Sequence, residues 1–144
     1  MDSTKKKMYY IRFCYWIGAI IDGLVAVDMF LYIIFGTPIY MKSPIPTQET
    51  QYIMTSGASL MVGWTFILIW GDQKPIQRRG LLLLTVFPVI VLFLIFDITL
   101  FLMGNKWISL ETTLIALIIR PILIVIFLTG YFSAKKWNHN VFFT

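Results

Sequence analysis

Four long runs of apolar residues, separated by short polar segments, dominate the pattern of the chain. They cover residues 9–35, 52–70, 81–103 and 112–132. A transmembrane helix needs about 20 consecutive apolar residues, and each run is close to that length or above it. The pattern therefore predicts an all-α integral membrane protein in which four transmembrane helices form an antiparallel bundle.

The segments between the runs are short and contain residues that end helices. Residues 36–51 hold three prolines, and proline inside a helix removes a hydrogen bond and clashes with the preceding turn. The second connection, residues 71–80, reads GDQKPIQRRG, and the third, residues 104–111, reads GNKWISLE. We find no internal repeat and expect the 144 residues to form a single membrane domain.

Lysine and arginine are distributed unequally between the two sides that these spans define. Nine lie in the terminal flanks and the second connection, and two lie in the other connections. Cytoplasmic flanks carry the excess of Lys and Arg, so both termini are predicted to be cytoplasmic, in a multi-pass protein of the plasma or inner membrane. The nine are Lys5, Lys6, Lys7, Arg12, Lys74, Arg78, Arg79, Lys135 and Lys136, and the two are Lys42 and Lys106.

The composition agrees with lipid as the main solvent of the chain. Mean hydropathy is +0.79, 58% of the residues are hydrophobic and only 13% are charged, whereas soluble domains carry about 25% charged residues. The net charge of +5 is explained by the basic flanks of the spans. We therefore expect the lipid bilayer, and no nucleic acid, as a partner.

Four charged residues lie deep inside the apolar runs, and Arg12 lies near the start of the first run. The four are Asp22 and Asp28 in the first run, Asp97 in the third and Arg120 in the fourth. Such charges are costly in a membrane and usually face a partner or a site. At about 1.5 Å of rise per residue, Asp28, Asp97 and Arg120 lie at similar heights, about 9–12 Å from the non-cytoplasmic helix ends. A short connection makes the last two helices antiparallel neighbours, so we expect an Asp97–Arg120 ion pair, with Asp28 able to complete the site. The pair is equally consistent with a purely structural link.

The acids in the spans outnumber the base. Arg120 neutralises one carboxylate, and each further ionised carboxylate in a low dielectric costs several kcal/mol. At least one Asp is therefore expected to be protonated, to face water, or to meet a cation or a cationic ligand. Asp22 is the main candidate, because it lies about 20 Å from the non-cytoplasmic end, deeper than the others and farthest from Arg120.

Two prolines in the spans predict local interruptions of the helices. Pro121 directly follows Arg120 and frees the carbonyl of Leu117, while Pro88 frees the carbonyl of Leu84. Freed carbonyls of this kind are tolerated where another group satisfies them. The arrangement puts an acceptor for a hydrogen bond next to the Arg120 guanidinium.

The chain lacks the residues that most membrane metal and redox sites use. Its only histidine, His139, lies in the C-terminal tail, and Cys14 is its only cysteine. Haem, di-iron and zinc sites need clusters of such ligands. We assign no catalytic residue, no metal and no cofactor, and an enzyme is the less favoured class.

A small transporter or ligand-binding bundle fits these features best. In it, Asp22 and Asp28 bind a proton, a cation or another small-molecule ligand, and Asp97–Arg120 acts as a gate or an anchor for an anionic group. Because four helices enclose little space, a pore would require a homo-oligomer. Two alternatives remain: an accessory or structural subunit of a membrane complex, and a lipid-modifying enzyme that uses Asp carboxylates. The face of Ser56, Ser59 and Gly63 is predicted to pack against a helix.

Overall fold

The computed structural model describes residues 3–36, 47–103 and 110–141, and these ranges are helical apart from their turns. Residues 37–46 and 104–109, which make up most of the first and third predicted connections and contain Lys42 and Lys106, lie outside the described residues. The helices, in chain order, are α1 (Ser3–Phe35), α2 (Gln48–Asp72), α3 (Gly80–Leu84), η1 (Thr85–Val91), α4 (Leu92–Leu102) and α5 (Leu110–Val141).

Within the described ranges, four helices are long and apolar enough to cross a membrane. They are Lys5–Phe35, Gln48–Asp72, Gly80–Leu102 and Leu114–Lys135, and the third consists of α3, η1 and α4 in succession. Their outward faces are apolar, as illustrated by Leu60, which is 74% exposed, on α2. The predicted all-helical class with four helices of this kind is confirmed.

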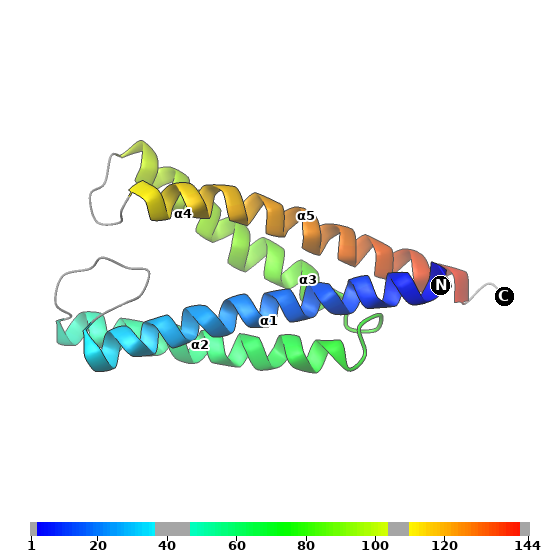
Figure 1. Ribbon diagram of the computed structural model, residues 1–144, viewed down its shortest axis with the longest axis horizontal. Coiled ribbons are helices and arrows are strands. Elements are labelled where there is room, and N and C mark those ends of the chain that lie inside the picture. The colour runs from blue at the N-terminus through cyan, green and yellow to red at the C-terminus, as the bar shows by residue number, and fades with distance from the viewer. Residues whose placement is uncertain (1–2, 37–46, 104–109, 142–144) are drawn as a thin grey trace.

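The helices pair as two antiparallel hairpins. α1 packs along α2, and α5 packs along α3, η1 and α4 (Figure 1). The hairpins meet where α1 begins, α2 ends and α5 ends, and they diverge toward the opposite end (Figure 1). We call the meeting point the basic end, because Lys5, Lys6, Lys7, Lys74, Arg78, Arg79 and Lys135 belong to its segments.

The tightest core lies at the basic end. Tyr15 of α1 and Leu82 of α3 are fully buried, and Phe127 of α5 is 1% exposed. The Tyr15 hydroxyl donates to the Arg78 carbonyl at 2.8 Å. A side chain at Gly71 of α2 would meet the Tyr15 ring at 2.5 Å, so glycine is required there. The packing of Tyr15 with Leu82 and Phe127 joins the two hairpins at this end, while the Gly71–Tyr15 contact holds α2 against α1.

A second close approach joins α1 to α5. A methyl group at Gly130 would lie 2.7 Å from Cys14 Sγ, so Gly130→Ala is expected to destabilise the fold by about 1–3 kcal/mol through overpacking. Thermal unfolding followed by helical circular dichroism in detergent micelles measures this effect. Adding Cys14→Ala should recover most of the loss, because it removes Sγ. Gly63→Ala is the control, with no atom within 4 Å of the added methyl, and a loss there equal to that of Gly130→Ala would contradict the prediction.

The two prolines have different effects on their helices. Pro88 lies inside η1, a π-helix over Thr85–Val91, and a widened turn of this kind accommodates the missing N–H and the ring. Pro121 lies inside α5, which is assigned as one α-helix from Leu110 to Val141. The helical course continues through both positions.

The predicted packing face of α2 contacts no other helix of the described chain closely. Ser56, Ser59 and Gly63 are exposed. The two hydroxyls donate to carbonyls of their own helix, Ser56 to Tyr52 at 3.1 Å and Ser59 to Thr55 at 2.9 Å. The side of α2 that packs on α1 instead contains Ala58, which is fully buried, and Gly57, which approaches Met29.

Candidate ligand-binding cavity

Arg120 of α5 forms an ion pair with Asp97 of α4. The pairing predicted from the sequence is therefore present. The same guanidinium nitrogen, Nη1, donates to the Phe93 carbonyl at 2.6 Å, and the guanidinium lies 5.1 Å from the centroid of the Phe93 ring. Phe93 and Asp97 are one helical turn apart and share a face of α4, so one guanidinium reaches both.

This ion pair is largely shielded from solvent. Asp97 is 6% exposed and the Arg120 side chain is 24% exposed. A buried pair of this kind is stable only when both charges keep their partners. The positive charge of Arg120 is thus already matched by one carboxylate and one carbonyl.

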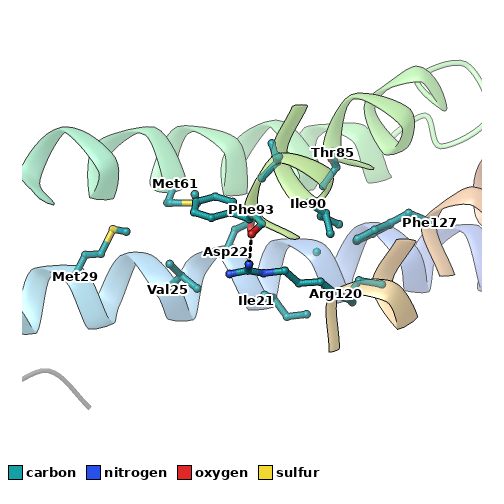
Figure 2. Close-up of a pocket in the computed structure, with 13 residues that line it drawn as sticks. Ile21, Asp22, Val25, Met29, Met61, Thr85, Ile90, Phe93, Arg120 and Phe127 are labelled. Atoms are coloured by element: carbon teal, nitrogen blue, oxygen red, sulfur yellow. Dashed lines mark hydrogen bonds between the residues drawn. The ribbon is translucent and has the colours of Figure 1, made fainter. Parts of the chain in front are cut away.

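Two adjoining cavities lie between the hairpins, next to Arg120. The smaller has a volume of about 230 Å³ and is lined by Asp22 of α1, Thr85 of η1, Phe93 of α4 and Arg120 of α5. Figure 2 shows these side chains around it, together with apolar residues from all four membrane-length helices. The larger has a volume of about 450 Å³, lies between α1 and α5, and is lined by Asp28 and Arg120. Both cavities are bordered by Ile21, Val25, Met29, Arg120 and Leu123.

Asp22 is the acid whose interactions are incomplete. Its carboxylate oxygen Oδ2 is buried and has no hydrogen-bond partner among the described residues. Neither ion pair found in the described part of the chain involves Asp22. A buried polar atom without a partner costs about 1–3 kcal/mol. Asp22 takes no part in the Asp97–Arg120 ion pair, although Asp22, expected to lie farthest from Arg120, lines the same cavity as Arg120.

Asp28 occupies a different part of the site. It is 6% exposed, lines the larger cavity and is engaged in an interaction within the chain. Arg120 borders both cavities, whereas Asp22 lines only the smaller and Asp28 only the larger. Asp97 lines neither and is linked to this region through its ion pair with Arg120. The role of each in binding a ligand stays a prediction.

A second ion pair, at the basic end, was missed by the sequence analysis. Arg12 of α1 donates to Asp72 of α2 through Nε to Oδ1 at 2.8 Å and through Nη2 to Oδ2 at 2.7 Å. Trp16 Nε1 also donates to Oδ2, at 3.2 Å. A signal was available, because Arg12 and Asp72 both lie 30 positions from residue 42, near the middle of the connection between these helices. In an antiparallel hairpin, two residues equally far in sequence from the middle of the connection lie level with each other along the helix axes.

Metal ligation has little support in the described part of the chain. No group of three or more His, Cys, Asp or Glu side chains is placed there to hold a metal ion. The two adjoining cavities each combine one carboxylate and the paired Arg120 guanidinium with apolar walls, a lining typical of sites for small organic molecules.

Comparison with known proteins adds no relative: no family model, no curated protein and no solved structure matches the chain.

Proposed function

We propose that the chain is a multi-pass membrane protein with both termini in the cytoplasm, and that it binds a proton or a small cationic ligand at Asp22 and carries it across the membrane. The observation that carries this proposal is the cavity between the hairpins, bordered by an acid whose buried oxygen has no partner in the described chain. Burying such an atom without a partner is costly, and a proton or a cation compensates it most directly.

The proposed orientation is supported by the two ends of the structure. The start of α1, the turn between α2 and α3, and the end of α5 lie together at the basic end (Figure 1). An excess of Lys and Arg on one side marks the cytoplasmic side of a membrane protein. Lipid would then contact the apolar outward faces of the four helices.

Transport is supported by the unequal contact between the hairpins. At the basic end, Tyr15 of α1, Leu82 of α3 and Phe127 of α5 form a closed core between the hairpins. Toward the other end the hairpins diverge (Figure 1). Rocking of one hairpin against the other would expose Asp22 to either side, which is how alternating access works in many transporters.

Proton flux into liposomes tests the proposal. The protein is reconstituted with a pH-sensitive dye inside, and a pH gradient is imposed. We expect flux above that of protein-free liposomes, lost in Asp22→Asn and retained in Glu49→Gln, a control that removes an exposed carboxylate of α2 outside both cavities. Unchanged flux in Asp22→Asn would refute the role of Asp22 in proton transport, and no flux in any variant would refute proton transport.

One observation favours a second function, that of a subunit in a membrane complex. Ser56, Ser59 and Gly63 form an exposed face of small residues on α2, and faces of this kind allow close approach of another membrane helix. A second copy of the chain would serve equally, which is the predicted homo-oligomer. Cross-linking through a cysteine introduced at Ser59, in membranes, tests both. A dimer-sized product supports the homo-oligomer, a product of another size supports a different subunit, and a monomer alone counts against both.

A further inference from the structure

We propose that the ligand of the cavity is an organic monocation with an apolar body, bound with its cationic group near Asp22 and its body between α1, α4 and α5. The inference rests on the proposed function and specifies the ligand of the same site. It is carried by three properties of the cavity: its charge balance, its shortage of oxygen ligands and its apolar walls.

The charge balance around the cavity favours a cation. Arg120 is neutralised by Asp97 and also donates to the Phe93 carbonyl. Asp28 borders the adjoining cavity and is engaged within the chain. Asp22 has no ion-pair partner among the described side chains. An anion entering this space would meet the carboxylates of Asp22 and Asp28 and a guanidinium that is already paired. A monocation would instead neutralise the negative charge of Asp22.

The shortage of oxygen ligands disfavours a metal ion. Hard cations such as Ca²⁺ and Mg²⁺ require about six or more oxygens. Along the smaller cavity, the side-chain oxygens belong to Asp22 and Thr85. The Thr85 hydroxyl is occupied, since it donates to the Leu81 carbonyl at 2.8 Å and accepts from Trp64 Nε1 at 3.2 Å. An alkylammonium group differs from a metal ion in that one carboxylate and neighbouring aromatic faces suffice to hold it.

The walls of the cavity suit an apolar body. Methionine adapts its shape to different ligands, and aromatic rings attract cations as well as alkyl groups. The smaller cavity has a volume of about 230 Å³ and adjoins the larger one of about 450 Å³, which is room for a ligand of drug-like size. The apolar side chains of the smaller cavity include Ile21, Val25, Met29, Met61, Phe93 and Phe127.

Charge-selective labelling of a cysteine in the cavity tests this inference. Val25 borders both cavities and lies three residues from Asp22, on the same side of α1. The variant Val25→Cys is made with Cys14→Ala, which removes the native thiol. In proteoliposomes it is reacted with a trimethylammonium methanethiosulfonate and, separately, with a sulfonate methanethiosulfonate of similar size. Gln48→Cys, at the exposed start of α2, gives the intrinsic ratio of the two reagents.

We expect position 25 to react with the cationic reagent on the order of tenfold faster, relative to the ratio at position 48, because Asp22 attracts it at short range in a low dielectric. Asp22→Asn should remove that preference, and benzyltrimethylammonium should slow the labelling while benzenesulfonate does not. Met29→Cys, one turn further along α1 and also bordering both cavities, repeats the measurement if Val25→Cys does not fold.

The labelling results distinguish failure of the proposed ligand from failure of the proposed function. Equal or faster reaction with the sulfonate, or a cation preference that survives Asp22→Asn, overturns the inference about the ligand and leaves an accessible cavity, as the proposed function requires. No reaction at either cavity position, with normal reaction at position 48, overturns the proposed function itself.

Discussion

Arg120→Met is expected to destabilise the fold by about 3–5 kcal/mol, the usual cost of removing one partner of a buried ion pair. Methionine keeps most of the volume and the apolar stem of Arg120 but leaves the Asp97 carboxylate, which is 6% exposed, without its cation. The Phe93 carbonyl also loses the donor that lies 2.6 Å away. Thermal unfolding in detergent micelles, followed by helical circular dichroism, measures the loss.

Two further variants distinguish the effect of losing the Asp97–Arg120 ion pair from the effect of losing any positive charge. Lys135→Met removes a positive charge from an exposed position of the same helix, and we expect a change within about 0.5 kcal/mol, as for surface substitutions generally. Asp97→Leu combined with Arg120→Met removes both charges and is expected to recover most of the stability, since apolar residues of similar volume can replace a buried pair. If Arg120→Met alone unfolds at the wild-type temperature, the pair has no structural role.

The pairing of Asp97 with Arg120 could be predicted because it depends on local information. The two residues lie in consecutive apolar runs joined by a short connection, and such runs form antiparallel neighbours. Their similar heights then follow from the rise of an α-helix. The same reasoning, applied to the first two runs, predicts the Arg12–Asp72 pair. It was missed because Arg12 was counted with the N-terminal flank and Asp72 with the second connection, and their heights were not compared.

The cavity between the hairpins could not be predicted in the same way. It depends on which faces of α1 and α5 meet, and membrane helices carry little polar contrast to mark such faces, because lipid is as apolar as the helix interface. The contact is decided by fine packing, such as Gly130 of α5 against Cys14 of α1 and Gly18 of α1 against Phe127 of α5. These details bring the hairpins together at the basic end and leave space further along.

The course of the helices at the prolines was predicted only in part. Pro88 was expected to disturb one turn, and the structure instead has a π-helix of seven residues, Thr85–Val91. Thr85, whose hydroxyl accepts from Trp64, belongs to this segment and borders the cavity. A π-helix shifts the register of every residue after it, so the faces presented by Phe93 and Asp97 depend on it. The position of a proline in the sequence does not reveal this shift.

Asp22 and Asp97 are both aspartates inside apolar helices, yet their substitutions are expected to have opposite effects on stability. Asp97→Asn replaces the Asp97–Arg120 ion pair, which stabilises the fold, with a weaker interaction. Asp22→Asn removes a charge for which the described chain offers no cation, and the affected oxygen, Oδ2, has no hydrogen-bond partner there. The amide of Asn still places polar atoms in the same space, whereas Leu places none.

We therefore expect the ligand-free protein to become more stable in the order wild type, Asp22→Asn, Asp22→Leu, with Leu gaining about 1–3 kcal/mol from removal of the unsatisfied polar group. Both variants should lose the rise in unfolding temperature that benzyltrimethylammonium produces in wild type, because a ligand stabilises a protein only through its affinity for the folded state. A gain in stability accompanied by loss of binding is the pattern of a group retained for function. If Asp22→Asn and Asp22→Leu instead destabilise the fold as much as Asp97→Asn does, Asp22 is a structural residue and the ligand site lies elsewhere.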